Sequence, residues 1–150
     1  MTDIALVLTE NSFDVEIQES DLMPDEGLET AVAISLFSDR RVSDEQLPDF
    51  ETDKRGYWGD AFPEVDKDKI GSRLWTMDRS KVLTETPRRS EELCKEALEW
   101  MKEDGIAGEI TINSEYNESK HMTTEIQISR PEGEVIRFEV LWDQQKLRRL

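Results

Sequence analysis

The last third of the chain alternates apolar with polar residues over three separate stretches. The alternating apolar positions are Ile110, Ile112, Ile126, Ile128, Ile136, Phe138, Val140 and Trp142. Successive side chains of a β-strand point to opposite faces of a sheet, so a spacing of two is typical of strands. Residues 130–133, Arg-Pro-Glu-Gly, supply a turn between two of the stretches. The pattern predicts a three-stranded antiparallel meander.

The residues before this meander favour a mixed α+β fold with an N-terminal hairpin and about three helices. Two short apolar stretches within residues 3–18, with a turn at Asn11-Ser12 between them, predict the hairpin. Apolar residues at steps of three and four predict a first helix over about residues 26–38. A second helical region is expected to begin near Ser72 and to include Leu74, Trp75, Val82 and Leu83. A third helix is expected after Thr86 and Pro87, because threonine caps helices and proline suits the first helical position.

We expect these elements to form one domain over residues 1–143, followed by a short basic tail at 144–150, since 150 residues suffice for a single core. Within this domain, residues 42–70 form a long irregular loop that contains nine acidic residues. Such loops are usually functional or disordered. Tyr57 and Trp58 in the middle of the loop argue against disorder, because disordered segments are poor in aromatic residues.

The chain is strongly acidic, with 35 acidic and 19 basic side chains and a net charge of −16. Most of this charge lies in residues 1–70, which hold 19 acids and 6 bases. The balance argues against direct binding of nucleic acids or of anionic membranes, because both need clustered lysine and arginine. The acidic half is interpreted either as a solvated surface or as a docking surface for a basic partner.

The sequence predicts no catalytic residue, no cofactor and no metal site. Cys94 and His121 are the single cysteine and the single histidine, too few for the usual zinc patterns or a cysteine–histidine pair. Among so many carboxylates no pair can be chosen as a general acid and base. The N-terminus lacks the features of a signal peptide, and no apolar stretch is long enough to span a membrane. We therefore expect a soluble protein that is made in the cytoplasm and has no enzymatic activity.

The first candidate protein-binding residues lie in the long loop: Arg55, Tyr57, Trp58 and Asp60. Tryptophan, tyrosine and arginine are enriched in the residues that dominate binding energies at protein interfaces. The alternative is that Tyr57 and Trp58 fill the domain's own core and hold the loop down, since tryptophan is mostly buried.

The second group of candidates lies on the last strand, over residues 135–142. Its members are Ile136, Phe138, Val140 and Trp142. This strand either completes the sheet or leaves an open edge to which a partner can add a strand.

Several segments in a fixed order resemble the small baseplate tail protein of Mu-like contractile phages and prophages. The segments are Asp-Ile-Ala-Leu-Val at 3–7, the Leu-Glu-Thr-Ala helix within 27–41, Arg-Gly-Tyr-Trp-Gly-Asp at 55–60, Ile-Gly-Ser-Arg-Leu-Trp at 70–75 and Arg-Phe-Glu-Val-Leu-Trp at 137–142. The resemblance covers about residues 3–142, and the Gly-Tyr-Trp-Gly-Asp and Gly-Ser-Arg-Leu-Trp blocks are its most specific parts.

The resemblance implies a structural role in the virion tail baseplate. It implies binding to wedge and hub proteins, help in starting the contractile sheath, and six copies around the hub. The family also looks related to the small wedge subunit, often labelled lysozyme-like, of larger contractile tails and of type VI secretion baseplates. The Glu-Pro-Arg signature of that wider group has no match in this sequence, so the wider link rests on role and fold.

Two other functions remain open at this point. An acidic stand-alone binding protein or inhibitor would use the charge, and would bind a basic enzyme in a salt-dependent way. A glycan hydrolase would need two carboxylates across a cleft. For the isolated chain we expect a monomer or weak oligomer.

Overall fold

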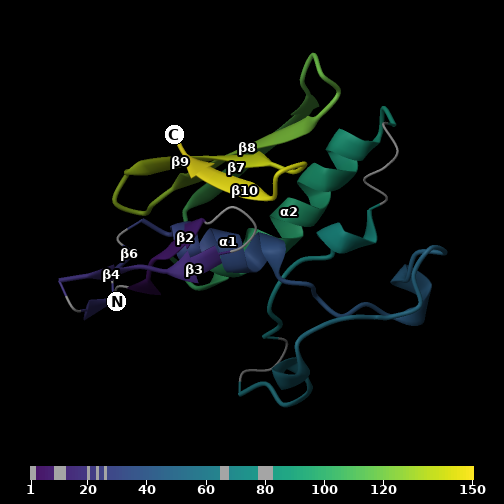
Figure 1. The fold of residues 1–150 in the computed structure, drawn as a ribbon, viewed down its shortest axis with the longest axis horizontal. Helices are drawn as coiled ribbons and strands as arrows, with labels where there is room; N and C mark the ends of the chain where they lie inside the picture. The colour runs from purple at the N-terminus through teal and green to yellow at the C-terminus, as the bar shows by residue number, and fades with distance from the viewer. Residues whose placement is uncertain are drawn as a thin grey trace.

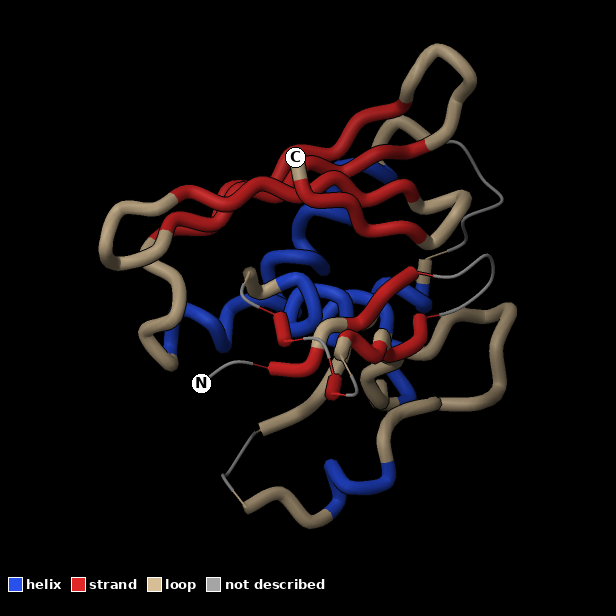
Figure 2. Tube along the Cα trace, turned by 60° about the vertical axis from the view of Figure 1, so that its left-hand side comes forward, coloured by secondary structure: helices blue, strands red, loops and turns tan. Residues whose placement is uncertain are grey.

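The computed structural model describes residues 3–8, 13–19, 21–22, 24–25, 27–64, 68–77 and 83–150. Its largest element is an antiparallel sheet of four strands in the order β10-β9-β8-β7 (Figure 1). The strands are β7 (Glu109–Tyr116), β8 (Met122–Ser129), β9 (Val135–Leu141) and β10 (Lys146–Arg149). Two helices, α1 (Glu29–Phe37) and α2 (Thr86–Glu103), lie against one face of this sheet (Figures 1 and 2).

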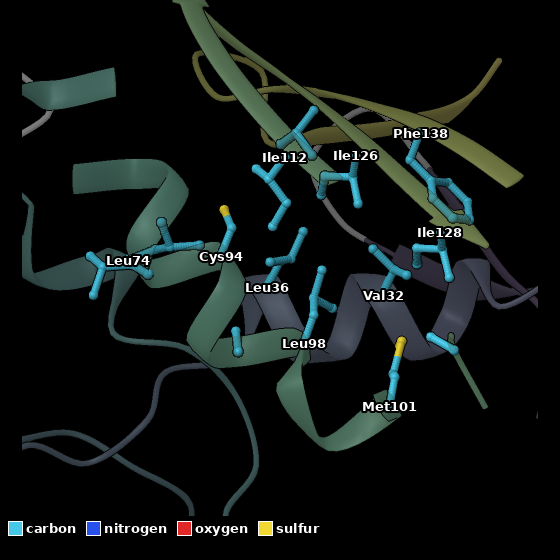
Figure 3. Close-up of a cluster of buried hydrophobic side chains, with 14 of the residues drawn as sticks. Val32, Leu36, Leu74, Cys94, Leu98, Met101, Ile112, Ile126, Ile128 and Phe138 are labelled. Carbon is cyan, nitrogen blue, oxygen red and sulfur yellow. The ribbon is translucent and has the colours of Figure 1, made fainter. Parts of the chain in front are cut away.

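The core fills the space between the two helices and the sheet (Figure 3). Its members include Val32, Leu36, Leu93, Leu98, Met101, Ile126, Ile128, Phe138 and Val140. The side chains of α2 in this core recur at steps of three and four, and those of β8 and β9 at steps of two. Each large apolar side chain that is buried fully contributes about 1.5–3 kcal/mol to folding. The core therefore holds both helices onto the sheet.

The expected three-stranded meander is wrong, because the sheet has a fourth strand. Lys146–Arg149, expected to be part of a basic tail, pairs with β9 as β10, so that Lys146 lies opposite Leu141. A strand at the edge of a sheet has one neighbour and commonly carries charged side chains. Its sequence consequently shows no strict alternation, and the strand was missed.

The expected helix near Ser72, the second of the three, is also wrong: the described residues contain two α-helices, α1 and α2, which correspond to the expected first and third helices. Near Ser72 the chain forms only a short 3₁₀ turn, η3 (Leu74–Thr76). Ser72 itself is extended, because its amide donates to the carbonyl of Ser38 and it forms a parallel bridge with Asp39. An extended residue held in this way cannot begin a helix. Residue 82, also assigned to this helix, lies outside the described residues.

The described N-terminal residues form three small sheets of two strands each. These pairs are β1 (Asp3–Ile4) with β6 (Pro24–Asp25), β2 (Leu6–Leu8) with β3 (Phe13–Val15), and β4 (Ile17–Gln18) with β5 (Asp21–Leu22). The pair β2–β3 lies within the segment expected to form a hairpin, whereas the other two pairs were not expected. The predicted turn at residues 11–12 lies outside the described part of the chain. Thr30 ties these strands to α1: its hydroxyl donates to the Ile4 carbonyl and accepts from the Leu6 amide.

Candidate functional site

The long loop is closed at its base by contacts between residues 41–42 and 54–55. The amide of Val42 donates to the carbonyl of Lys54 at 3.1 Å, and the guanidinium of Arg41 donates to the carbonyl of Arg55 at the same distance. Val42 is buried. The segment between these contacts carries one 3₁₀ turn, η1 (Asp44–Gln46). Residues 42–54 thus form a surface loop whose two ends are held together.

Arg55 links this loop to the body of the protein. Its guanidinium donates to Asp39 at 2.9 Å and to Glu51 at 3.0 Å, and its central carbon lies 4.6 Å from the ring centroid of Trp75. The hydrogen bonds that it donates to Glu51 and Asp39 raise the pKa of Arg55 above its ordinary value. Arg55 therefore has a structural role at the base of the site.

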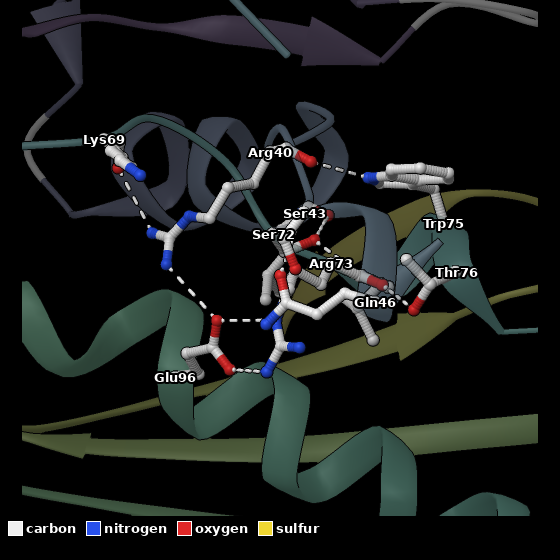
Figure 4. Close-up of polar contacts among 11 residues, drawn as sticks. Arg40, Ser43, Gln46, Lys69, Ser72, Arg73, Trp75, Thr76 and Glu96 are labelled. Atoms are coloured by element: carbon white, nitrogen blue, oxygen red, sulfur yellow. Dashed lines mark hydrogen bonds and ion pairs between the residues drawn. The ribbon is translucent and has the colours of Figure 1, made fainter. Parts of the chain in front are cut away.

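The Gly-Ser-Arg-Leu-Trp block at 71–75 is held against the C-terminal end of α1 (Figure 4). The amide of Ser72 donates to the Ser38 carbonyl and its hydroxyl to the Leu36 carbonyl at 2.7 Å. The indole of Trp75 donates to the Arg40 carbonyl at 2.9 Å. Gly71 has a φ of +88°, and a Cβ atom there would lie 2.4 Å from the Ser38 carbonyl oxygen. Only glycine therefore allows this close approach.

Glu96 of α2 joins the same region through two arginines (Figure 4). Arg73 donates to both carboxylate oxygens of Glu96, one of them over 2.9 Å, and Arg40 contacts it at 3.4 Å. The hydrogen bond from Arg73, supported by the positive charges of Arg73 and Arg40, lowers the pKa of Glu96 below its ordinary value. Arg40 also donates to the Lys69 carbonyl at 3.1 Å. This cluster fixes the start and the end of residues 40–73 to α2.

Tyr57 and Trp58 lie at the surface on top of this fixed base. Trp58 begins the 3₁₀ turn η2 (Trp58–Ala61); its side chain is 77% exposed, and that of Tyr57 is 49% exposed. Their ring centroids are 5.3 Å apart. The neighbouring Phe62 is 83% exposed. The structure therefore does not place these aromatic residues in the core, and they form an exposed apolar surface, the aromatic loop surface (Tyr57, Trp58 and Phe62).

Two details hold the aromatic loop surface in shape. Gly59 lies so close to the Tyr57 ring that a Cβ atom there would be 2.3 Å from Cε1 of that ring. Asp60 accepts a hydrogen bond from the Ile70 amide at 3.3 Å, which connects the two sides of the loop. Asp60 thus positions the loop, in the same way as Arg55, while Tyr57 and Trp58 are the side chains presented outward.

The second group of candidate residues belongs to the core. Ile136, Phe138, Val140 and Trp142 are all at most 5% exposed. β9, which carries the first three, pairs with β8 on one side and with β10 on the other. The strand at 135–142 therefore completes the sheet and has no open edge.

The edges of the sheet are β7 and β10. On β7 the amide of Ser114 donates to a carboxylate oxygen of Glu91 in α2 at 2.7 Å, so that part of the edge is already occupied. Directly after β10, the amide of Leu150 donates to the carbonyl of Arg137 in β9. Because backbone groups alternate in direction along a strand, those of Leu147 and Arg149 point away from β9. Sequence reasoning missed this edge, together with Phe62.

No group that favours catalysis or metal binding is apparent in the described residues. They contain no cluster of three or more histidine, cysteine or acidic side chains placed to hold a metal ion. Burial raises the pKa of the Cys94 thiol to about 12, which keeps it protonated. His121 is exposed and contacts Asp143 at 3.2 Å. Neither described helix combines the length and the apolar composition needed to cross a bilayer.

Comparison with known proteins confirms the resemblance seen in the sequence. The family model described as phage protein GP46 matches residues 28–135. Baseplate protein gp46 of Escherichia phage Mu is 38% identical over 140 residues, which cover 93% of this chain and 94% of that protein. The Mu-like prophage FluMu protein gp46 of Haemophilus influenzae is 32% identical over 89% of this chain and 90% of its own length. No solved structure matches significantly. The chain therefore belongs to the phage protein GP46 family, a family of Mu-like baseplate proteins.

Proposed function

We propose that this chain is a non-enzymatic structural subunit of a contractile tail baseplate, where it binds neighbouring wedge and hub proteins through the aromatic loop surface. The name of its Mu relative supports the place in the baseplate. The observation that carries the binding surface is the exposure of Tyr57, Trp58 and Phe62 on a loop whose base is fixed. An assembly role of this kind needs shape and contact area, and no bond chemistry.

The geometry of the loop suits binding, because the aromatic side chains are presented in a fixed arrangement. Arg55 holds one side of the loop through its ion pairs with Asp39 and Glu51. The side chain of Asp60 holds the other side by accepting a hydrogen bond from the Ile70 amide. A partner therefore does not have to pay the full entropy cost of ordering this segment. Large apolar side chains that are exposed close together are typical of protein interaction sites.

Co-purification tests this proposal. The tagged chain would be co-expressed with the tail proteins encoded beside it, including the large wedge subunit and the sheath protein, and complexes separated by gel filtration. We expect a stoichiometric complex that Trp58→Ala weakens at least tenfold. Leu83→Ala is the matched control, since Leu83 is another exposed apolar residue outside the loop. A complex equally stable in both variants would contradict binding through the loop.

A role in starting the sheath is the second part of the proposal, and the open edge of β10 supports it. Arg149→Pro would remove an outward-pointing amide while leaving the ladder to β9 intact. Arg149→Ala is the control, since it removes the same side chain and its 4.0 Å contact with Glu29. We expect the proline variant alone to lose binding of the sheath protein. Equal sheath binding by both variants would count against strand pairing at β10.

A further inference from the structure

An apolar stripe leaves the protein body along the N-terminal arm, which we define as residues 13–19 and 21–22. At its base, the ring of Phe13 lies 5.7 Å from that of Phe37, which in turn lies 6.0 Å from the ring of Trp142. Val15 lies two residues after Phe13 in β3, so these two side chains share one face of the strand, and Ile17 follows at the same spacing at the start of β4. The stripe therefore starts at the edge of the core and continues outward.

Beyond Phe13 the side chains of the stripe are exposed. Val15 is 46% exposed and Ile17 69% exposed, while Leu22, the cross-strand partner of Ile17, is 42% exposed. The arm ends in β4 and β5, two strands of two residues each. A ribbon this short is marginally stable in water, and a cross-strand apolar pair on it gains most of its stabilisation when another surface covers it.

The charge of the arm defines what can cover it. The arm carries Asp14, Glu16, Glu19 and Asp21 and no basic side chain. The sequence contains no lysine or arginine before Arg40, although ten acidic residues precede it. Such an uncompensated negative field attracts a positively charged protein surface and accelerates its encounter.

The same charge disfavours the other occupants. A second copy of this chain would bring two acidic arms or two acidic loops together, and the net charge of −16 opposes this approach. Two of the three basic side chains of β10 are already engaged, because Arg148 pairs with Glu139 at 2.7 Å and Arg149 with Glu29 at 4.0 Å. Nucleic acids and anionic membranes carry the same sign of charge as the arm.

We infer that the N-terminal arm is a second docking surface, which receives an apolar segment flanked by lysine and arginine from a neighbouring baseplate protein. This inference rests on the proposed function. β4 lies on the left of Figure 1 and the teal loop that carries η2 at its bottom, so the two surfaces are apart. The chain thereby contacts its neighbours at two separate places.

Site-specific crosslinking tests the inference. A photo-reactive residue would replace Ile17 or Leu22 in the chain co-expressed with its neighbouring tail proteins, and the crosslinked peptide would be sequenced. We expect a peptide in which lysine and arginine outnumber aspartate and glutamate. The control position is Val135, an exposed aliphatic residue at the start of β9, where we expect no crosslink to that peptide.

A pair of variants measures the contribution of the arm. Ile17→Thr with Leu22→Thr keeps residues that favour strands and removes the apolar stripe. We expect at least a fivefold loss of the crosslinked partner without a change in the thermal midpoint of the isolated chain. Asp14→Asn with Glu16→Gln should weaken the salt dependence of the same binding, since it removes charge and keeps shape.

The outcomes separate this inference from the proposed function. Absence of any complex would contradict the assembly role and this inference together. A complex that Trp58→Ala disrupts, but in which positions 17 and 22 do not react and the threonine variant binds fully, would overturn the arm alone. A crosslink to a second copy of the chain, or to an acidic or neutral segment, would overturn it as well.

Discussion

The guanidinium of Arg55 lies over the ring of Trp75, with its central carbon 4.6 Å from the ring centroid. Arg55 belongs to the block at 55–60 and Trp75 to the block at 70–75, two of the segments that resemble the Mu-like family. Trp75 is buried and its indole donates to the Arg40 carbonyl, so the ring is a fixed platform. Arg55 on this platform also pairs with Asp39 and Glu51. The two blocks are therefore one structural unit: the second holds the first, and the first presents Tyr57 and Trp58.

Replacing Arg55 should loosen the aromatic loop surface and destabilise the protein moderately. Arg55→Lys loses the planar, stacked and forked contacts, and we expect it to lower the free energy of unfolding by about 1–2 kcal/mol. Urea unfolding followed by circular dichroism measures this change. Arg148→Lys is the control, since Arg148 is more exposed and makes a single surface pair; its effect should stay under about 0.5 kcal/mol. Equal effects would contradict the anchoring role of Arg55.

Gly71 should be far less tolerant of alanine than Gly133, although both have positive φ angles. A Cβ atom at Gly71 would meet the Ser38 carbonyl, whereas nothing lies within 4 Å of one at Gly133. We expect Gly133→Ala to cost about 1 kcal/mol from its backbone conformation alone. Gly71→Ala should cost at least about 1 kcal/mol more, because Ser38 has to move. Thermal and urea unfolding of both variants measure the loss of unfolding free energy. Equal losses in the two variants would argue against the close approach of Gly71 to Ser38.

The Glu96 cluster should make stability fall in acid. The pKa of Glu96 is lowered in the folded protein, so its contribution is fully present above the ordinary value of 4.5 and disappears as the pH falls through the lower, folded value. Glu96→Gln should therefore be less stable than the wild type at pH 7, and the difference should shrink as the pH falls below 4.5. Urea unfolding at a series of pH values measures it. If the stability difference between the wild type and Glu96→Gln does not change with pH, the ion pairs of Glu96 are not its cause.

Cys94 should be almost unreactive in the native protein. It is buried and its thiol pKa is raised to about 12, so little thiolate is available at neutral pH. We expect alkylation by iodoacetamide at pH 8 to be at least a hundredfold slower than in 6 M guanidinium chloride, followed by intact mass. Fast native labelling would show that α2 separates from the sheet readily.

The isolated chain should be a monomer or weak oligomer. Its net charge of −16 opposes self-association. Light scattering after gel filtration at moderate salt should give the mass of one chain. A stable hexameric ring in isolation would contradict this expectation.

Local sequence patterns were enough to predict the helices and strands in which buried and exposed positions recur at a regular spacing. The spacing of two over residues 110–142 and the steps of three and four in α1 and α2 were enough to predict β7, β8, β9 and both helices, because one face of each element is buried along its whole length. The order of the sequence blocks was also enough to indicate the family, which the comparisons confirmed.

Other features depend on contacts between residues far apart in the chain, and only the three-dimensional structure shows them. Tyr57 and Trp58 could have filled the core or faced solvent, and the difference arises from the contacts of Arg55 with Asp39 and Trp75. Lys146–Arg149 becomes a strand because β9 offers it backbone partners, although its own side chains favour a tail. The N-terminal arm is exposed because its apolar stripe extends past the last core ring that could cover it. Backbone pairing and burial are shared between segments far apart in the chain, so no local pattern encodes them.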